Sequence, residues 1–542
     1  MKTSLLLLFC AAGMLYTEAA EIRIKIEKQY LNLPISHQSE RKKIHFIAEG
    51  LNEEANDIRL AEGSIDYWVF RDFSALKGKY LTIRFDGNTE GLSRMYQSDQ
   101  IAGADSLYKE TNRPQIHFTS KRGWMNDPNG LLYANGEYHL YFQHNPYERE
   151  WGNMHWGHAV SRDLVHWEEL PIALYPDSLG TMFSGSAVMD YHNTAGFNRD
   201  GKTALVAIYT ADGARGQTQC IAYSLDHGRT FNKYHVNPVI DSGKEWNSRD
   251  TRDPKVFWHK PSQHWVMVLN ERDGHSIYTS SDLKNWQYQS HTQGFWECPE
   301  LFELPVDGKA DNTRWVMYGA SGTYMIGSFD GKQFTPEAGK FYFQKGNIYA
   351  TQTITDAPDA RRIQIGWGSV HHEGMPFKSM MTIPVELTLR TTPQGIRLFS
   401  LPIKEFDILK KNTISHTNLT ADEANKLLKT FPTNEPLYLK CTIEAHEATG
   451  IGLNINGRNL LGYDLNHNTI NGIPYSPADF TSKQITVELY IDRTTAEVFI
   501  DQGALSLTLQ RDLPRENNSG LSFYGNKLTI HHLEIAPLKS IW

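Results

Sequence analysis

The stretch His264–Trp286, HWVMVLNERDGHSIYTSSDLKNW, carries the pattern from which the fold is predicted. It opens with an apolar run, ending at Asn270, that has the length and the branched and aromatic content of a buried strand. Ser280-Ser-Asp282 with Trp286 after it is typical of a strand that ends in a tight turn, because an Asp side chain accepts hydrogen bonds from the backbone two residues ahead. The stretch therefore predicts consecutive strands joined by short turns.

Similar apolar runs occur five times, and their first residues lie 49 to 66 residues apart. They are YHLYFQ (Tyr138–Gln143), ALVAIYT (Ala204–Thr210), HWVMVLN (His264–Asn270), TRWVMYGA (Thr313–Ala320) and RIQIGWG (Arg362–Gly368). A turn with Asp and a following aromatic residue comes after four of them, starting at Ser161, Ser224, Ser280 and Ser328. Repeats of about 50 residues built of strands predict a β-propeller, here with five blades. A sandwich of irregular hairpins is the alternative.

The sequence on either side of the repeats predicts further β structure, so the expected class is all-β. Residues 21–110 begin with the alternating segment Ile22–Ile26 and predict a small N-terminal β domain ahead of the propeller at 111–395. Residues 396–435 are expected to form a linker with a short helix, because Thr420-Ala-Asp-Glu423 has the spacing of a capping box. Residues 436–542 alternate again and predict a C-terminal β-sandwich.

Residues 1–20 are predicted to be a signal peptide. Lys2 precedes the apolar run Leu5–Leu15, and the small-residue segment Thr17–Ala19 is a suitable cleavage site. We therefore expect an exported protein, without a membrane span because no later run reaches about 18 apolar residues. Cys10 is a candidate site for a lipid anchor, although the bulky Phe9 before it fits such a site badly.

Charge and cysteine usage exclude other classes. Lys and Arg number 54 and Asp and Glu 62, for a net charge of −8, whereas a nucleic-acid partner needs a basic surface. Cys220, Cys298 and Cys441 are too far apart for a disulfide framework or a cysteine metal site. His155 and His158 flank Trp156, but no carboxylate cluster completes a metal site around them. We expect no metal and no cofactor.

Three acidic residues stand at the same point of different repeats. Asp127 lies in Asp127-Pro-Asn-Gly130, whose composition predicts a turn ahead of the first repeated run. Asp253 precedes the strand predicted at 255–258, and Glu297 precedes the strand predicted at 301–304. A single acid of this kind is usually part of a turn or a strand-end cap. In a propeller such positions border the central funnel, so the three carboxylates can meet. Two carboxylates hydrolyse glycosides with retention at a separation of about 5–5.5 Å or with inversion at about 6.5–9.5 Å, and the sequence leaves both open.

Four motifs resemble those of glycoside hydrolase family 32, which includes invertases, inulinases and levanases. In order, they are Trp124-Met-Asn-Asp-Pro-Asn-Gly130, Phe183-Ser-Gly-Ser186, Arg252-Asp-Pro254 and Glu297-Cys-Pro299. The resemblance runs from about Pro114 to the C-terminus and implies a five-bladed propeller followed by a β-sandwich, with a retaining reaction on β-fructofuranosides. It implies that Asp127 is the nucleophile, Glu297 the general acid and base, and Asp253 the transition-state stabiliser. The sugar-binding positions that it implies are Trp124, Asn126, Gln143, Trp151, Phe183, Ser184, Arg252 and Trp367.

These observations predict an exported hydrolase that releases terminal fructose from levan, inulin or sucrose through a covalent fructosyl-enzyme. Its partner is an oligo- or polysaccharide. A fructosyltransferase, an endo-acting levanase and an inverting arabinan hydrolase are alternatives, since each can use a similar funnel of acids. The alternative from another class is a fructan-binding protein without turnover.

Overall fold

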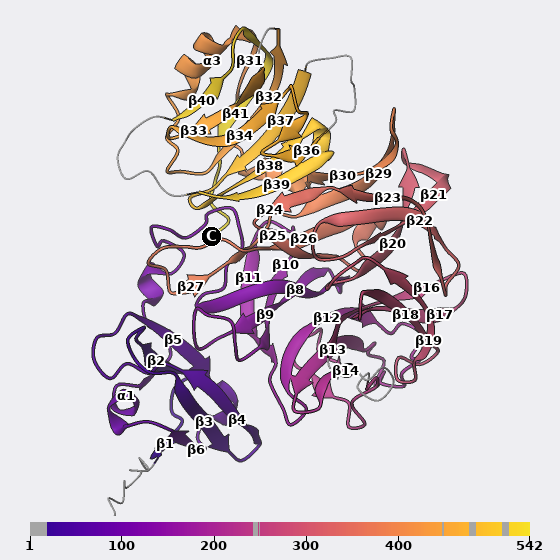
Figure 1. Cartoon of the computed structure of the whole chain (residues 1–542). Helices are drawn as coiled ribbons and strands as arrows, with labels where there is room; N and C mark the ends of the chain where they lie inside the picture. The colour runs from indigo at the N-terminus through magenta and orange to yellow at the C-terminus, as the bar shows by residue number, and fades with distance from the viewer. Residues whose placement is uncertain (1–18, 242–247, 249, 447–448, 476–483, 512–519) are drawn as a thin grey trace, which may run out of the picture. The chain divides into compact units, whose positions relative to one another are not determined.

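The computed structural model describes residues 19–241, 248, 250–446, 449–475, 484–511 and 520–542. The chain divides into two compact units, Met1–Ala104 and Asp105–Trp542, and strands dominate both (Figure 1). The expected all-β class is confirmed. None of the helices in these ranges has the length and apolar character that crossing a membrane requires.

The N-terminal unit contains two small sheets, with strand orders β1-β6-β3-β4 and β5-β2-β7. The elements are β1 Ala20–Lys25, β2 Tyr30–Ile35, β3 Lys42–Ala48, β4 Leu51–Ile58, β5 Tyr67–Asp72, β6 Tyr80–Phe85, α1 Thr89–Ser93 and β7 Tyr96–Ser98. Most of the predicted signal peptide, with Cys10, lies outside the described residues. Ala20 pairs with Phe85, so the folded unit begins one residue before the predicted boundary.

The larger unit begins with three groups of four antiparallel strands, each in its own sheet (Figure 1). The first group is β8 Gly123–Ala134, β9 Glu137–Asn145, β10 His155–Ser161 and β11 Trp167–Leu174. The second is β12 Thr181–Met189, β13 Leu205–Gly213, β14 Gly216–Ser224 and β15 Asn232–Lys233. The third is β16 Thr251–His259, β17 His264–Glu271, β18 Gly274–Ser280 and β19 Gln287–Gln293. A short strand, β27 Phe377–Lys378, adds to the free edge of β8.

A nine-stranded sheet follows, in the order β23-β22-β21-β20-β29-β26-β25, with β28 beside β26 and β30 beside β29. Its strands are β20 Glu300–Val306, β21 Lys309–Tyr318, β22 Thr323–Phe329, β23 Phe334–Tyr342, β25 Ile348–Thr353, β26 Ile363–Gly368, β28 Met380–Met381, β29 Val385–Thr392 and β30 Gly395–Pro402. The five apolar runs of the sequence fall in β9, β13, β17, β21 and β26, so each of the five is a strand as predicted.

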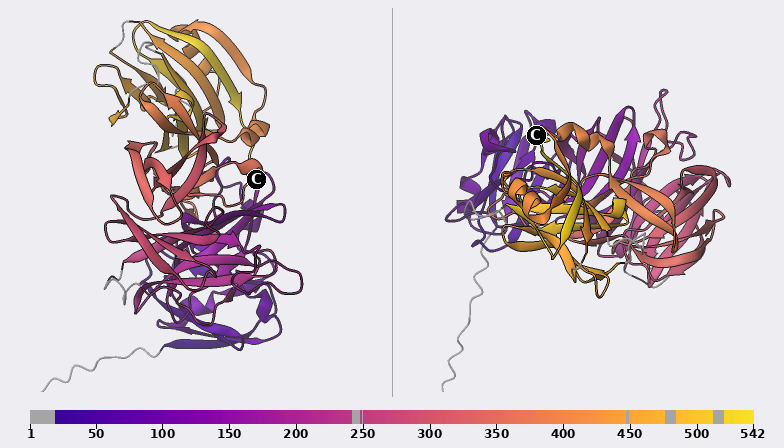
Figure 2. Two further views of the ribbon diagram at one scale, coloured as in Figure 1. Left: turned by 90° about the vertical axis from the view of Figure 1, so that its right-hand side faces the viewer. Right: turned by 90° about the horizontal axis from the view of Figure 1, so that it is seen from above.

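Two further sheets close the chain and share one hydrophobic core, to which Leu439 contributes from the first sheet and Ile451 and Leu453 from the second. The seven-stranded sheet holds β24 Gln344–Gly346, β31 Ile414–Thr420, β32 Leu437–Ala445, β37 Gln484–Ile491, β38 Thr495–Ile500, β39 Leu505–Gln510 and β41 Leu528–Pro537. The five-stranded sheet holds β33 Gly450–Ile455, β34 Arg458–Asp464, β35 Thr469–Ile470, β36 Ile473–Pro474 and β40 Leu521–Tyr524. In Figure 1 and in the left view of Figure 2, these orange and yellow strands lie at one end of the larger unit.

The predicted Asp turns form as the sequence indicates. Asp282 Oδ1 accepts hydrogen bonds from the backbone N–H of Lys284 and of Asn285, at 3.0 and 2.8 Å. In the same turn, the Ser280 hydroxyl donates a hydrogen bond to Asp282 Oδ1 at 3.1 Å. Asp163, Asp226 and Asp330 accept backbone hydrogen bonds in the same way at the ends of β10, β14 and β22.

The stretch 396–435 contains more regular structure than the expected linker with a short helix. It holds β30, paired with β29 through eight residues, and β31, paired with β41, besides the helix α3 Ala421–Leu428. The hairpin that returns into β30 has a glycine, Gly395, at a positive φ, so the glycine marks a turn between paired strands. The helix itself begins with the predicted capping box of Thr420 and Glu423.

A buried group of charges joins the seven-stranded sheet to the segment before β8. His117 Nδ1 lies 2.7 Å from Asp492 Oδ2, and His117 Nε2 lies 3.0 Å from Glu497 Oε1. Asp492 also accepts the backbone N–H of Gln115 and Ile116, both at 2.8 Å. Burial by itself lowers the pKa of His117, but the hydrogen bonds and charges of the two carboxylates outweigh it and raise the pKa to about 9. The imidazolium is therefore the cation between two buried acids.

Replacing His117 by Gln is expected to lower the free energy of unfolding by about 3–5 kcal/mol, because it leaves two buried carboxylates without a cation. Since the folded-state pKa is raised, the wild-type advantage is complete below about pH 6.5 and is lost as the pH rises through about 9. Urea unfolding between pH 6 and 10 measures it, with the exposed His416→Gln as the control. A difference between H117Q and wild type that does not shrink above pH 9 contradicts the charged histidine.

Candidate active site

A β-bulge interrupts each of four strands, and in three of them it falls at residues that the sequence singled out. In β8, Asn126 and Asp127 lie where the register with β9 shifts, and in β12, Phe183 and Ser184 lie where the register with β13 shifts. The registers of β16 and β25 shift in the same way, at Asp253-Pro254 and at Ala350-Thr351. A bulge places two successive side chains where a regular strand places one, and it turns them out of the ladder.

The prediction that Asp127-Pro-Asn-Gly130 forms a turn ahead of a strand is therefore wrong. The four residues lie inside β8, and Asp253 likewise lies inside β16. The turn-like composition reflects the bulge, which needs unusual backbone angles in the middle of a strand. Glu297 does precede its strand, β20, as predicted.

One polar side chain near the end of each second strand makes a hydrogen bond with the backbone at or beside the predicted site residues of the next group. Gln143, at the end of the first apolar run, donates through Nε2 to the backbone oxygen of Met182 at 2.9 Å. Thr210 Oγ1 accepts the backbone N–H of Asp253 at 3.1 Å. Asn270 Oδ1 accepts the backbone N–H of Glu297 at 2.8 Å. The three contacts repeat one arrangement from group to group.

The backbone at the acids is held in the left-handed region. Asp253, Glu297 and Cys298 have φ values of +63°, +50° and +42°. Residues other than glycine occupy this region at an energetic cost, and such residues gather at functional sites. Next to the bulge of β12 only a glycine fits, because a Cβ on Gly185 would lie 2.0 Å from the backbone oxygen of Ile208.

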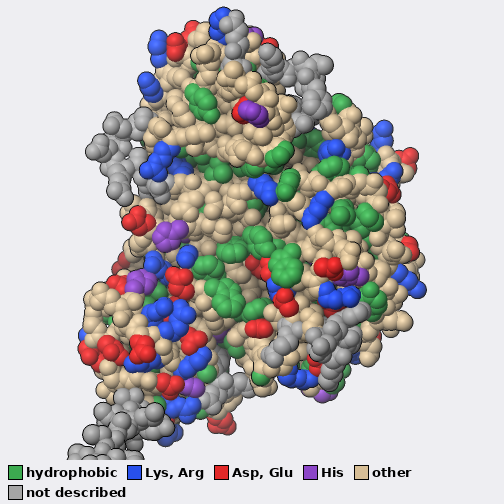
Figure 3. Space-filling model, viewed as in Figure 1, with side chains coloured by type: hydrophobic (Ala, Val, Ile, Leu, Met, Phe, Trp, Pro, Cys, Tyr) green, Lys and Arg blue, Asp and Glu red, His purple; other side chains and the backbone are tan. Residues whose placement is uncertain are grey.

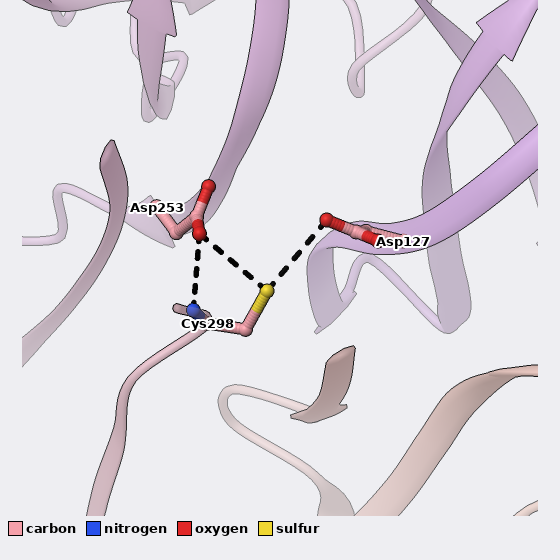
Figure 4. A group of neighbouring side chains, drawn as sticks. All are labelled: Asp127, Asp253 and Cys298. Carbon is pink, nitrogen blue, oxygen red and sulfur yellow. Dashed lines mark hydrogen bonds between the residues drawn. The ribbon is translucent and has the colours of Figure 1, made fainter. Parts of the chain in front are cut away.

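Asp127, Asp253 and Cys298 point toward one another from three different segments (Figure 4). The Cys298 thiol lies 3.6 Å from Asp127 Oδ2 and 3.6 Å from Asp253 Oδ2, and the Cys298 backbone N–H donates to Asp253 Oδ2 at 3.0 Å. Asp127 also accepts from the Ser184 hydroxyl at 2.7 Å and from Asn126 Nδ2 at 3.1 Å. The two carboxylates are thus separated by a single thiol.

Glu297, the residue before Cys298, is held by two donors. Arg252 Nη2 donates to Glu297 Oε1 at 2.5 Å, and the Tyr349 hydroxyl donates to Glu297 Oε2 at 2.6 Å. The guanidinium of Arg252 also contacts Asp250 and lies over the ring of Trp296 at 5.4 Å. Each oxygen of the Glu297 carboxylate is therefore held in place by one hydrogen-bond donor.

The predicted aromatic positions continue this network into a ring of contacts. Tyr349 lies edge-on to Trp367 at 6.2 Å, and Trp367 lies edge-on to Trp124 at 5.9 Å. Trp124 Nε1 donates to Asn126 Oδ1 at 2.7 Å, which leads back to Asp127.

Trp151 is 54% exposed and lies edge-on to Phe183 at 5.9 Å. All eleven predicted site residues are thus brought into one connected region. In Figure 3, hydrophobic side chains and a few acidic ones reach the surface near β8 and β12.

Burial sets the protonation of the acids. It raises the pKa of Asp253 to about 7, with the charge of Asp127 acting in the same direction and Arg252 against it. Burial also raises the pKa of Asp127, although its hydrogen bonds from Ser184 and Asn126 oppose the shift. The charge of Glu297 raises the Asp127 pKa further, which places the third acid within electrostatic reach of the first.

Asp127, Asp253 and Cys298 lie near enough to one another to offer three ligand atoms to a cation. Burial and the surrounding acids raise the pKa of the Cys298 thiol well above its usual range. A thiol that keeps its proton is a hydrogen-bond donor to the carboxylates and a poor metal ligand. The three side chains are therefore better suited to a hydrogen-bonded arrangement, in which the neutral thiol lies between two acids, than to binding a metal ion. Cys220, Cys298 and Cys441 are all free thiols.

Tyr349, Thr210 and Asn270 belong to the site, and the sequence reasoning missed them. Tyr349 lies in β25, a strand outside the five repeated runs, and its contact with Glu297 depends on chain pairing that no local pattern reveals. Thr210 and Asn270 did leave a signal. Each is the polar last residue of an otherwise apolar run, in the place that Gln143 occupies in the first run.

Comparison with known proteins places these residues in a wider group. Residues 117–402 match the family described as Glycosyl hydrolases family 32 N-terminal domain, and residues 17–115 match a domain of unknown function, DUF4980. The chain is 39% identical over 495 residues to the levanase of Bacillus subtilis, covering 81% of this chain and 72% of the relative. It is 36% identical over 488 residues to the extracellular exo-inulinase of Aspergillus niger, covering 74% and 90%. The crystal structure of exo-inulinase from Aspergillus awamori matches with a TM-score of 0.70 and 32% identity, over 80% of this chain and 100% of that one.

Replacing Asp253 by Asn is expected to stabilise the fold at neutral pH while removing a charge from the site. Because the folded-state pKa is raised to about 7, ionisation favours the unfolded chain between about pH 4 and 7. The variant should gain about 2–4 kcal/mol at pH 7.5 and nothing below pH 4. Thermal unfolding across this range measures it. The turn variant Asp282→Asn is the control and should show no gain, because the pKa of Asp282 is lowered through its backbone hydrogen bonds, against the effect of burial. A loss of stability in D253N at pH 7.5 contradicts the raised pKa.

Proposed function

The chain belongs to glycoside hydrolase family 32, as its motifs predicted, and from this membership and the geometry of its acids we propose that it is a retaining, exo-acting β-fructofuranosidase that releases fructose from fructans. The observation that carries the proposal is the meeting of Asp127 and Asp253 at Cys298, with Glu297 joined to Asp253 through Arg252. The chain is a glycosidase by family. Its preference for chain ends and its stereochemistry are parts of the proposal.

The fold that we propose for the catalytic part is a five-bladed propeller. The three four-stranded sheets supply three blades, β20–β23 a fourth, and β25, β26, β29 and β30 a fifth. The fourth and fifth blades belong to one sheet only because Val306 in β20 pairs with Leu389 in β29. Contacts of β12 with both β8 and β16, and of β25 with β8, support a closed ring. A bridge between Leu132 and Thr355 supports closure between the first and the fifth group.

The remaining domain boundaries are proposed in the same way. A separate N-terminal β domain at 21–110 is supported by the division of the chain after Ala104 and by the separate match of residues 17–115. A C-terminal sandwich at 436–542 is supported by the core that the seven-stranded and five-stranded sheets share. Export is supported by the predicted leader and by the relative from Aspergillus niger, which is described as extracellular.

In the first chemical step, an Asp127 oxygen attacks the anomeric carbon of a terminal fructose and forms a fructosyl ester. Glu297 gives its proton to the departing oxygen, so that the rest of the chain leaves as an alcohol. Ser184 and Asn126 hold the Asp127 carboxylate by hydrogen bonds, which direct it as a nucleophile. Arg252 and Tyr349 hold the two oxygens of the Glu297 carboxylate by hydrogen bonds.

In the second step, Glu297 takes a proton from water, the water oxygen attacks the same carbon, and Asp127 is released as a carboxylate. Both steps pass through a transition state with positive charge on the sugar. Asp253 is placed to bind fructose hydroxyls and, when ionised, to stabilise that charge. The rings of Trp124 and Trp367, which pack together, and of the exposed Trp151 suit the apolar faces of a sugar ring.

Exo-action is supported by what lies behind the acids. Lys255 and Glu300 form an ion pair at 2.8 Å, both buried, and Lys255 Nζ donates to the backbone oxygen of Thr353 at 2.8 Å. Lys255 follows Asp253 by two residues along β16, so a buried ion pair lies directly beyond this acid and supports a site that is closed on that side. A closed pocket accepts a chain end, whereas an open cleft accepts the middle of a polymer.

The direct test is to incubate the purified protein, and its Asp127→Asn variant, with sucrose, inulin and levan, and to follow product sizes over time. Free fructose as the first and main product from a fructan is expected. Oligosaccharides appearing first would indicate endo-action, and longer chains formed in concentrated sucrose would indicate a transferase. D127N should lose on the order of 10⁴-fold or more of turnover and remain folded, since Asn keeps the shape of the side chain. The exposed Asp311→Asn is the control, and activity retained by D127N contradicts the nucleophile.

The Glu297→Gln variant separates the acid from the nucleophile. A fructoside with an activated leaving group, such as an aryloxide, departs without protonation, so its first step should be little impaired in E297Q. The first step with sucrose should fall by about 10²-fold or more. Pre-steady-state release of the leaving group measures both. Equal impairment of the two substrates at that step would remove Glu297 as the general acid.

A further inference from the structure

A second cavity, of about 690 Å³, lies at the far ends of the strands that carry the candidate active site. Ser184 and Asp253 stand near the beginnings of β12 and β16, and the cavity is lined by residues at the ends of the same strands, including Val188 and Trp258. Four or five residues of a strand span about 15 Å. Lys255, which itself lines the cavity, pairs with the buried Glu300, so the cavity ends at this ion pair, whereas none of the three acids is in its lining.

Aromatic side chains form one wall of this cavity. Tyr191 is 61% exposed there, and the ring of the adjacent His192 lies 5.4 Å from Trp258. Trp258 packs edge-on against the buried Trp265 at 5.0 Å, and Trp265 Nε1 donates to Thr194 Oγ1 at 2.8 Å. Packing against the buried Trp265 therefore holds Trp258 in place, while Tyr191 remains exposed to solvent.

Two side chains of opposite charge, Arg362 and Asp356, line the cavity within electrostatic range of each other but without a direct hydrogen bond or ion pair between them. The guanidinium of Arg362 lies over the ring of Phe302 at 4.9 Å, and its buried Nε has no hydrogen-bond acceptor. Asp356, also in the lining, is exposed. Within the described part of the chain, neither Arg362 nor Asp356 forms a side-chain hydrogen bond or an ion pair. A buried guanidinium edge without an acceptor costs free energy that a ligand can recover.

We propose that this cavity is a second, non-catalytic binding site for the fructan chain. A sugar presents hydroxyl groups that both donate and accept hydrogen bonds, so one ligand can satisfy Arg362 and Asp356 together. Its apolar ring faces suit Tyr191 and Trp258. Lys255 and Arg361 in the lining already pair with Glu300 and Glu386. The remaining lining charges are of both signs, Asp356 and Glu303 against Lys260 and Arg362, so a neutral polyhydroxyl chain fits the lining better than an anion or a cation.

The inference rests on the proposed function, because it takes the polymer that the enzyme degrades as its ligand. Its consequence is specific to polymers. A chain held at the far end of the strands keeps the enzyme on its substrate between turnovers, while a disaccharide gains nothing from a site that is separate from the acids. The size of about 690 Å³ lies within the range of about 300–1,000 Å³ that is usual for small-molecule sites.

The test measures binding and turnover separately in the full chain. Tyr191→Ala and Arg362→Gln are each added to D127N, and affinity electrophoresis in gels with levan or inulin gives the dissociation constant for each polymer. The control Tyr342→Ala removes another tyrosine, 48% exposed, that does not line the cavity. The same substitutions in the active enzyme give kcat/KM on sucrose and on the polymers.

Tyr191→Ala and Arg362→Gln should each weaken polymer binding by about two- to tenfold and lower kcat/KM on the polymer, with kcat/KM on sucrose and the Tyr342→Ala control unchanged. Tyr191 is exposed, so its variant stays folded and keeps the test decisive if R362Q unfolds. Unchanged polymer binding in Tyr191→Ala overturns the proposal, as does absence of binding by D127N itself. Hydrolysis of fructans by the wild-type enzyme in the same series shows independently whether the proposed function stands.

Discussion

The hydrogen bonds that Gln143, Thr210 and Asn270 make with the backbone of the next strand group are the contacts on which the candidate active site depends. Each joins the end of one strand to the segment of the next group that carries predicted site residues, which is a bulge in β12 and β16 and the stretch before β20 in the third case. A bulge without such support would relax toward an ordinary ladder, and its side chains would return to alternate faces. Because the contact is repeated, neighbouring groups place their functional side chains toward one point. The acids thus converge although long stretches of sequence separate them.

This arrangement has a cost in stability that the surrounding residues reduce. Burial and mutual repulsion raise the pKa of Asp253 to about 7, so an ionised Asp253 works against folding at neutral pH. The Cys298 thiol keeps its proton and stands between the two carboxylates as a neutral donor, which lessens their repulsion. Away from the site, the buried His117 supplies the cation that Asp492 and Glu497 need. The buried charges are thus compensated by a cation where they hold sheets together, and they remain costly at the candidate active site.

Much of the architecture could be predicted from the sequence because its signals are local. The five apolar runs and the Asp turns after them reflect strand length and hydrogen bonding within a few residues, and all five runs are strands. The four motifs named the acids and their sugar-binding neighbours, and these residues form one connected region. The bulges could not be predicted, because a register shift exists only between paired strands. For the same reason the sequence predicts a turn at Asp127-Pro-Asn-Gly130 and a linker where β30 lies, and it gives no sign of Tyr349.

In the proposed mechanism Asp127 attacks the sugar, and Glu297 donates a proton to the leaving group and later accepts one from water. Trapping of the covalent intermediate tests these two roles most directly. In the Glu297→Gln variant an activated fructosyl donor should form the ester quickly, and the ester should persist because no base activates water. Mass spectrometry of the digested protein should then find one fructosyl group, on the peptide that contains Asp127. A fructosyl group on another residue, or product released from the variant with no labelled intermediate and with inverted configuration, would contradict the account.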